Sequence, residues 1–340
     1  MEKIKKEKIV KVIIGIITII LILLMFYFID FRLILSNFSK ISIYGIILFV
    51  LIYTITFILR SYRLKFIFQG LNSDASFLNL FGSFGIGWGI NEIIPGKFGD
   101  LVRLEFIRQK ERNLNRSKIL CGISIERFID LAILLLITIF TLLYLYFYDV
   151  KGINKLNLSF YIGIGALILI FSLIAVLILF FKGSWFLKIV GKISKKLMKK
   201  LEIFLKEFLI GINDFRKNKK KILITVVLSL PIWIIETLTL VLIFYLIGYE
   251  INIFIIILAQ SVLFFTKTFP ITPGGWFISE NVGALIILVF YPSIPYTILL
   301  SIFILDHILR VAYSLIYGSI SATTVNLKKI KLKKLNGDIE

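Results

Sequence analysis

The chain has 340 residues, of which 59% are hydrophobic, and its mean hydropathy is +0.96. This apolar share exceeds that of soluble domains, so the composition excludes a soluble globular protein and indicates an integral membrane protein. The formal net charge is +20, but the basic residues alternate with long apolar runs, so we expect no nucleic-acid partner.

The sequence contains one cysteine, Cys121, and one histidine, His307. One thiol cannot form an internal disulfide, and a single cysteine and a single histidine give no metal-ligand spacing. We therefore expect no metal site, no cofactor and no catalytic triad. We interpret His307 as a buried hydrogen-bonding residue.

Apolar runs of the length needed to cross a bilayer predict six membrane-spanning helices. They cover residues 12–29, 41–59, 119–148, 160–181, 222–247 and 295–319. The first run is too long for a cleavable signal peptide. The second span ends, on this interpretation, at Arg60 and Arg63.

Two further apolar stretches, 77–94 and 253–290, are interrupted by Pro-Gly sequences. Backbone without helical hydrogen bonds is tolerated at membrane depth where it is buried in protein or lines a wet cavity. We therefore predict two re-entrant helical hairpins, the first followed by a polar helix over 100–118. The glycines between Gly82 and Gly89 are interpreted as close-packing positions. The predicted fold class is an all-α polytopic membrane protein, with eight full spans as the alternative.

The distribution of Lys and Arg predicts the orientation of the chain. Segments assigned to the inside hold 33 of the 40 basic residues and the outside loops hold four. Both termini are therefore expected to be cytoplasmic, in a multi-pass protein of the cell membrane. Residues 184–221 alternate lysines with Leu, Ile and Phe, which is typical of a helix lying on an anionic cytoplasmic leaflet.

An internal repeat is predicted within a single membrane domain of residues 1–340. Residues 41–148 and 222–320 each contain a span, a broken hairpin and a span carrying acid and arginine together. The two repeats would have inverted topology, a common plan among alternating-access transporters. A homo-oligomer is compatible with this plan.

The first break offers the material for an anion site. A helix that restarts after Pro-Gly presents free N–H groups and a positive dipole end, both of which attract phosphate or carboxylate. The alternative is an interfacial turn that obeys the positive-inside rule. The candidate head-group-binding residues of this break are Pro95, Gly96, Lys97, Gly99, Asp100 and Arg103.

The second break and the charged residues of the spans complete the candidate site. From the second break we assign Pro273, Gly274, Gly275 and Glu280 to substrate binding, and from the spans Glu126, Arg127 and Arg310. Glu126, Arg127 and Asp130 could instead snorkel to the cytoplasmic surface. Asp306 and Arg310, spaced i, i+4, form either a structural pair or a switch. Glu236, Asp306 and Asp130 are assigned to charge balance or proton coupling, and Glu236 and Glu280 could also pair with arginines across helices.

These motifs resemble those of a known family. The run Pro95-Gly96-Lys97-Phe98-Gly99-Asp100-Leu101-Val102-Arg103 resembles the P-x-x-x-G-E-x-x-R element of the flippase-like membrane family. That family includes the transmembrane region of lysylphosphatidylglycerol synthases and archaeal proteins linked to dolichol-phosphate glycan assembly. Glu126-Arg127-Phe128-Ile129-Asp130 is similar to its E-R-x-x-D element, and Pro270 to Glu280 is similar to its P-x-x-P-G-G…E element.

The chain departs from the family pattern at Asp100, where Glu is usual, and at Trp276-Phe277-Ile278, where another glycine is common. The chain ends soon after the last span, so we expect no lysyl transfer. The resemblance implies a non-enzymatic protein that moves an anionic phospholipid or a polyprenyl-phosphate-linked lipid between leaflets. The alternatives are a membrane enzyme acting on lipid phosphates and a non-transporting partner of a synthase.

Overall fold

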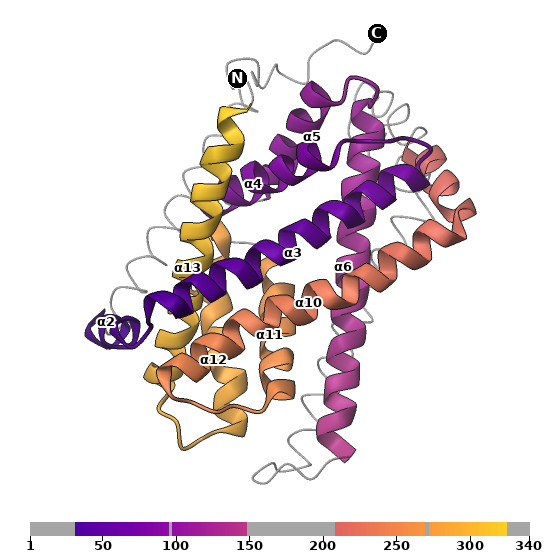
Figure 1. Cartoon of the computed structure of the whole chain (residues 1–340). Coiled ribbons are helices and arrows are strands. Elements are labelled where there is room, and N and C mark those ends of the chain that lie inside the picture. Colours follow the sequence, from indigo (N-terminus) through magenta and orange to yellow (C-terminus); the bar gives the residue numbers. More distant parts are fainter. Residues whose placement is uncertain (1–30, 95–96, 148–207, 269–271, 325–340) are drawn as a thin grey trace, which may run out of the picture.

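The computed structural model describes residues 31–94, 97–147, 208–268 and 272–324, and the regular elements within these ranges are all helices (Figure 1). The predicted all-α fold is confirmed. The predicted spans 12–29 and 160–181, and most of the basic segment 184–221, lie outside the described residues.

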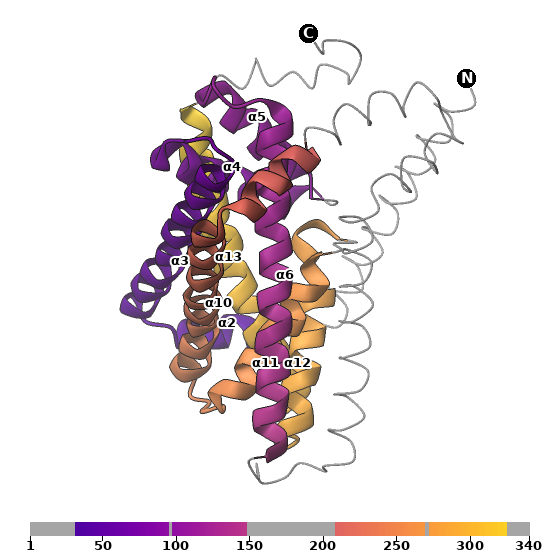
Figure 2. The same ribbon diagram turned by 90° about the vertical axis from the view of Figure 1, so that its right-hand side faces the viewer.

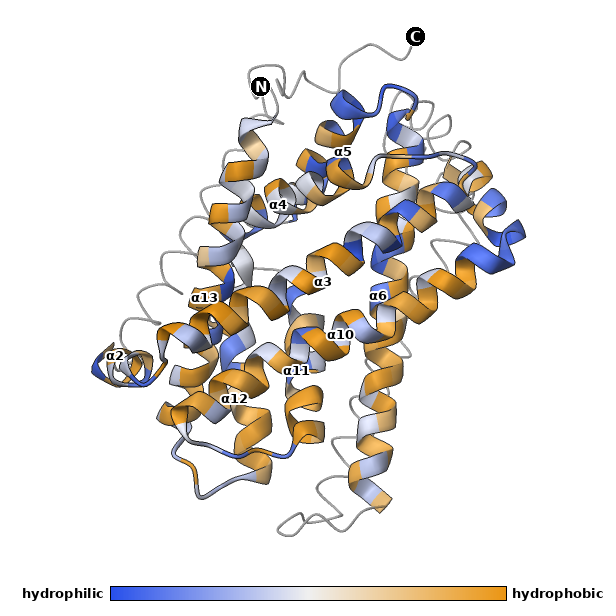
Figure 3. Cartoon of the chain, in the orientation of Figure 1, coloured by the Kyte–Doolittle hydropathy of each residue, from blue (hydrophilic) through white to orange (hydrophobic). Residues whose placement is uncertain are grey.

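Four long helices form the frame of the described part. They are α3 (Ile43–Gly70), α6 (Arg116–Phe147), α10 (Lys219–Ile247) and α13 (Tyr296–Thr323), and each is long and apolar enough to cross a membrane. Large apolar side chains such as Tyr44 and Leu51 remain exposed on their outer surfaces, which suits contact with hydrocarbon. Most positions along the helices are hydrophobic, and many hydrophilic positions lie toward the upper end of the molecule (Figure 3). The chain is therefore a polytopic membrane protein.

Two helical hairpins lie between the long helices. The first consists of α4 (Phe77–Ile93) and α5 (Phe98–Lys110), and the second consists of α11 (Ile253–Thr268), the short 3₁₀ turn η1 (Pro273–Gly275) and α12 (Ile278–Phe290). Their helices have 13 to 17 residues, fewer than the roughly 20 needed to cross the hydrocarbon core. This length fits re-entrant hairpins better than eight full spans.

The two halves run in opposite directions. In Figures 1 and 2, α4 and α5 lie at the upper end of the molecule, whereas α11 and α12 lie at the lower end. The helix α6 descends from the upper end and α13 ascends to it, while α3 and α10 lie side by side and antiparallel. Each hairpin packs against a long helix of the other half: α4 of the first half packs along α13, and α11 of the second half packs along α6.

Glycines allow the first hairpin to pack tightly. A Cβ atom on Gly99 would overlap the carbonyl oxygen of Gly87, and one on Gly87 would overlap the Arg103 side chain. On the other face of α4, a Cβ on Gly89 would come within 3.0 Å of the Ser314 carbonyl oxygen on α13. The predicted close-packing role of this glycine-rich stretch is confirmed.

Two predicted boundaries were wrong. The helix α3 continues to Gly70, because Leu64, Ile67 and Phe68 extend its buried apolar face. Arg60 and Arg63 therefore lie within the helix and are buried, not at its cytoplasmic end. The polar helix predicted over 100–118 is two elements, since α5 ends at Lys110 and α6 begins at Arg116.

The break between α5 and α6 has a local cause. The side-chain oxygen of Asn115 accepts a hydrogen bond from the Lys118 backbone N–H, which caps the first turn of α6. The predicted connection 30–40 also contains a short helix, α2 (Phe31–Ser39). Its Asn37 donates to Ser301 on α13 at 2.7 Å.

Candidate functional site

The tips of the two hairpins meet. Glu92, in the last turn of α4, lies against the backbone of η1, where a Cβ on Gly274 would overlap its carboxylate. Gly274 has φ +58°, a left-handed conformation that favours glycine. The end of α4 therefore contacts η1 of the second hairpin. Pro95 and Gly96 lie outside the described residues.

Beside this contact lies a set of buried charged residues, which we name the ion-pair cluster. Its members come from α3, α5, α6, α10 and α13, so it joins both halves of the chain. Eight of them were candidate residues from the sequence. The members are Arg60, Arg63, Asp100, Arg103, Glu126, Arg127, Asp130, Glu236, Asp306 and Arg310.

The first-hairpin side of the ion-pair cluster is centred on Arg103. Its guanidinium donates to Glu126 at 2.9 Å and to Asp100 at 3.4 Å. Asp100 also accepts from Arg127 at 2.7 Å. The Arg103 guanidinium lies 4.0 Å from the centre of the Phe84 ring, a distance at which a cation–π attraction contributes. Asp100, Arg103, Glu126 and Arg127 are thus one connected group.

The middle of the ion-pair cluster connects α3, α6 and α10. Arg63 makes two parallel hydrogen bonds to Asp130, at 2.6 and 3.0 Å, the bidentate geometry that distinguishes arginine from lysine. Trp233 donates its indole N–H to Asp130 at 3.1 Å. Arg60 lies 3.5 Å from Asp130 and also pairs with Glu236.

The second half contributes Arg310 and its partners. Arg310 donates to Asp306 at 2.7 Å and to Glu236 at 3.1 Å. It also donates to the Glu236 carbonyl at 3.2 Å and to the Thr239 hydroxyl. The pairing of Glu236 with Arg310 across helices, which the sequence left as one alternative, is present. Asp306 and Arg310 are part of a larger network and not an isolated pair.

The ion-pair cluster is balanced in charge and has unused donors. It contains five arginines and five carboxylates, each arginine within 4.0 Å of at least one acid. Burying this many charges is costly unless every charge is paired. Even so, Nε of Arg63 and Nε of Arg103 are buried without a hydrogen-bond partner. Glu126 Oε1 and Asp306 Oδ1 are likewise buried without a hydrogen-bond partner, so donors and acceptors of the cluster are both left unpaired among the described residues.

Glu126, Arg127 and Asp130 do not snorkel. Glu126 and Asp130 are 0% and 5% exposed, and the Arg127 side chain is 28% exposed and turned toward Asp100. The three residues are neighbours on α6, and their partners come from α3 and α5. This arrangement places them among the helices instead of at the surface.

A second set of residues, which we name the hairpin-tip cluster, surrounds His307. His307 Nδ1 contacts Glu280 Oε1, and Nε2 lies 3.3 Å from Glu92 Oε2. The Trp276 ring stacks on the imidazole at a centroid distance of 4.2 Å, and Ser279 donates to Glu280 at 2.6 Å. The interpretation of His307 as a buried hydrogen-bonding residue is confirmed. The members are Glu92, Lys267, Trp276, Ser279, Glu280 and His307.

Lys97 lies at the first break, outside the four helices long enough to cross a membrane. Lys97 is the N-cap residue of α5, and its backbone is in the left-handed conformation with φ 59°. Burial first, and then the neighbouring Arg127 guanidinium, lower the pKa of the Lys97 amine to about 8. The amine therefore changes charge close to physiological pH.

Sequence reasoning missed Arg60, Arg63, Glu92 and Lys267. Arg60 and Arg63 were assigned to a cytoplasmic end because they follow an apolar run. The signal that could have identified them is the apolar sequence on both sides, from Phe57 to Phe68, with the two arginines one turn apart. Glu92 belonged to the first break but carried no recognisable spacing to a partner.

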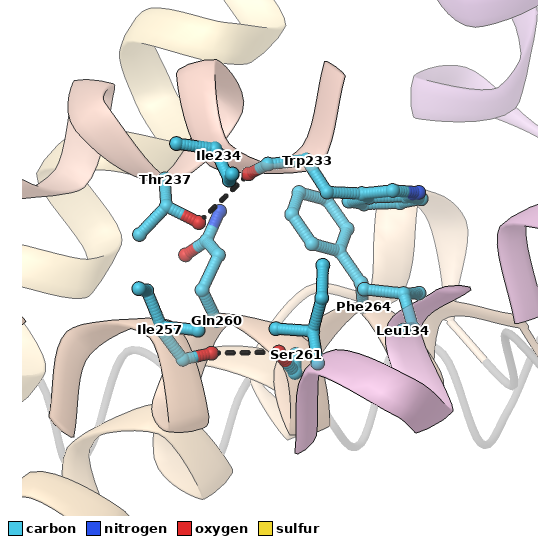
Figure 4. Close-up of a pocket in the computed structure, with 9 residues that line it drawn as sticks. Leu134, Trp233, Ile234, Thr237, Ile257, Gln260, Ser261 and Phe264 are labelled. Carbon is cyan, nitrogen blue, oxygen red and sulfur yellow. Dashed lines mark hydrogen bonds between the residues drawn. The ribbon is translucent and has the colours of Figure 1, made fainter. Parts of the chain in front are cut away.

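An apolar crevice lies next to the ion-pair cluster, between α6, α10 and α11 (Figure 4). Trp233 and Phe264 form one side of it, and Gln260 points into it. Gln260 is 1% exposed, and neither its amide nitrogen nor its amide oxygen has a hydrogen-bond partner. Trp233 separates the crevice from Arg60, whose guanidinium lies 4.8 Å from the indole ring.

The described residues contain no group of three or more His, Cys, Asp or Glu side chains arranged to hold a metal ion. The acids of the ion-pair cluster face arginines instead. The ion-pair cluster therefore contains arginine donors and carboxylate acceptors in equal number, with the aromatic rings of Phe84 and Trp233 beside the arginines.

Comparison with known proteins found one matching family and similar archaeal membrane proteins. Residues 9–318 match the family described as the lysylphosphatidylglycerol synthase TM region. The UPF0104 membrane protein MJ1595 of Methanocaldococcus jannaschii is 27% identical over 305 residues, covering 86% of this chain and 87% of that protein. The UPF0104 membrane protein PH1989 of Pyrococcus horikoshii is 25% identical over 260 residues, covering 72% and 76%. No solved structure matched the chain.

Proposed function

The chain belongs to the lysylphosphatidylglycerol synthase TM region family, and on this premise we propose that it moves an anionic lipid between the two leaflets. The lipid is a phospholipid or a polyprenyl-phosphate-linked lipid, and the protein acts as a transporter and not as an enzyme. We place it in the cell membrane with both termini on the cytoplasmic side.

One observation carries the proposal. Two re-entrant hairpins that enter from opposite ends of the molecule meet at Glu92 and Gly274, directly beside a buried cluster with five arginines. Alternating-access transporters place their substrate site where inverted repeats with broken helices meet. Charged residues at that depth are costly and are typical of a substrate path.

The chemistry of the ion-pair cluster suits a phosphate group. Arginine binds phosphate with two parallel hydrogen bonds, the same geometry that Arg63 uses toward Asp130. A phosphate that enters next to Arg103 would compete with Glu126 for the guanidinium and would also reach the free Nε. The arginines would then exchange carboxylate partners for the substrate and return to them after release.

The crevice beside Gln260 supports a lateral route for the lipid. Its apolar lining, including Leu134 and Ile257, suits a hydrocarbon chain, and Trp233 forms its boundary with the arginines. A lipid could thus keep its tail in the membrane while its head group lies among the arginines. The crevice has room for about one water molecule, so a hydrocarbon chain enters only after α6, α10 and α11 separate.

Reconstitution tests the proposal. The full-length chain is placed in liposomes with a fluorescent phosphatidylglycerol or polyprenyl-phosphate probe in one leaflet, and the accessible fraction is followed with a membrane-impermeant quencher. Redistribution of a chemically unchanged probe is the expected result. A chemically altered probe would instead indicate an enzyme, and neither change would indicate a non-transporting partner protein.

A further inference from the structure

The charge balance of the ion-pair cluster sets a requirement on any anionic substrate. Five arginines already face five carboxylates there. An entering phosphate would add negative charge to a buried cluster that is already balanced, which is unfavourable. This step rests on the proposed function, because it asks what could accompany an anionic lipid. A proton taken up with the lipid would offset that charge and needs little space.

The hairpin-tip cluster has the geometry of a proton-binding site. His307 is 2% exposed and lies between two carboxylates that come from opposite hairpins. Glu92 belongs to the first hairpin and its side chain is 12% exposed, whereas Glu280 belongs to the second and is 1% exposed. Each ring nitrogen faces a different carboxylate, so the imidazole connects a more accessible acid with a buried one.

One carboxylate oxygen of Glu280 has no hydrogen-bond partner among the described residues. Its Oε1 accepts from Ser279 at 2.6 Å and contacts His307. Its Oε2 is buried and has no partner among the described residues. A buried carboxylate oxygen without a donor costs more when the group is ionised than when the group is the neutral acid with its proton on the other oxygen.

We propose that Glu92, His307 and Glu280 form a proton-binding site that takes up one proton with each anionic lipid head group. A proton from solution first neutralises Glu92 and then passes to His307 Nε2, while the imidazole releases its Nδ1 proton to Glu280 Oε1. Glu92 returns to its ionised form, and Glu280 starts ionised and ends as the neutral acid. His307 is neutral at both stages, with its proton on Nδ1 before the transfer and on Nε2 after it. No atom or electron is left over in this transfer.

The surrounding charges make this site sensitive to the head group. Lys267 on α11 opposes a positive imidazole, and the two glutamates favour it. Histidine changes its charge near neutral pH, unlike the arginines of the ion-pair cluster. An arriving anion would offset Lys267 and so favour proton uptake. The groups outside the hairpin-tip cluster that interact with its charges are Tyr53 on α3, which lies near Glu92, and Lys97, which lies near Glu92 and Lys267.

Proton uptake on lipid binding tests the inference without any transport measurement. The full-length protein in detergent, in weakly buffered solution with a pH indicator, is mixed with phosphatidylglycerol or with polyprenyl phosphate. We expect uptake of about one proton per bound anionic lipid, and none with zwitterionic phosphatidylcholine. His307→Gln should bind the anionic lipid more weakly and take up less than a fifth as many protons.

Two further variants keep the test decisive. Glu280→Gln preserves the shape of the buried acid and should also abolish uptake, which covers the case in which His307→Gln does not fold. Glu250→Gln removes a carboxylate from an exposed turn and should match the wild type. Anionic lipid binding without proton uptake in the wild type, or uptake unchanged in both site variants, would overturn the inference. Failure of both anionic lipids to bind would instead overturn the proposed function itself.

Discussion

Arg103 on α5 donates to Glu126 on α6 at 2.9 Å, and neither side chain has any exposed surface. This contact connects the re-entrant hairpin to the long helix that follows it in the chain. Its energy depends on both partners, because removing one leaves the other as a buried, unpaired charge. The same contact is the point at which a phosphate could replace a carboxylate.

Arg103→Lys should slow lipid movement by ten- to a hundredfold. Lysine cannot donate to Glu126 and Asp100 at once or lie flat on the Phe84 ring. Loss of one such charge-assisted hydrogen bond corresponds to about 1.5–3 kcal/mol. The assay is probe redistribution in liposomes. Arg108→Lys is the matched control, because Arg108 lies on the same helix but is exposed and pairs with Glu105 at the surface. Equal rates for both variants would rule out a role for the Arg103 guanidinium.

Arg310→Ala should both unfold more easily and stop lipid movement. It leaves Asp306 buried without its arginine and removes one of the two arginines that contact Glu236, at a cost of about 3–5 kcal/mol. The double change Asp306→Leu with Arg310→Met replaces the pair with apolar side chains and should recover most of the stability without recovering transport. Thermal unfolding in detergent measures the stability of the wild type, the double variant and Arg310→Ala, which should decrease in that order. A double variant less stable than Arg310→Ala would contradict this account.

The sequence predicted those features of the fold and of the candidate site that depend on neighbouring residues in the chain. The Pro-Gly breaks and the i, i+4 spacing of Asp306 and Arg310 are local features, and the hairpins and the pair were predicted from them. Arg60 and Arg63 were misplaced because a membrane span was expected to end where charge begins. Their partners, Glu236 and Asp130, lie 176 and 67 residues further along the chain. Pairing at that separation depends on helix packing, which no local pattern encodes.

Gly99→Ala should destabilise the first hairpin. The added methyl group would overlap the Gly87 carbonyl oxygen and the Asn91 side chain, which accepts a hydrogen bond from the Gly99 N–H at 2.8 Å. Overpacking of this kind costs about 1–3 kcal/mol. Gly82→Ala is the comparison, because its methyl group would meet the Phe106 ring at 3.0 Å and not backbone. We expect Gly99→Ala to unfold at a lower temperature than Gly82→Ala, and the reverse order would show that the α4–α5 contact can relax.

Binding of anionic lipid should weaken as the pH rises through about 8, because the Lys97 pKa is lowered to about 8 by burial and by Arg127. The amine is charged below that pH and attracts the head group, and it is neutral above it. Arginine at position 97 stays charged over this range, so the affinity of Lys97→Arg for anionic lipid should fall less than that of the wild type between pH 7 and pH 9. We expect the two losses of affinity to differ by roughly tenfold, or about 1.4 kcal/mol. Lys219→Arg, an exposed position at the start of α10, should keep the wild-type profile. A Lys97→Arg profile identical to the wild type would exclude Lys97 from the head-group site.

Gln260→Leu should make the protein more stable and should slow lipid movement. The amide is buried with neither atom hydrogen-bonded, so an apolar side chain of similar size removes a penalty of about 1–3 kcal/mol. The melting temperature should therefore rise by several degrees. Lipid movement should slow because the closed packing of α6, α10 and α11 is stabilised, whereas passage of the lipid requires these helices to separate. Ser261→Ala is the control, since the Ser261 hydroxyl already donates to the Ile257 carbonyl at 2.7 Å. Unchanged transport in a stabilised Gln260→Leu protein would mean that the lipid does not use this crevice, and a lower melting temperature would mean that Gln260 is already bonded in the membrane.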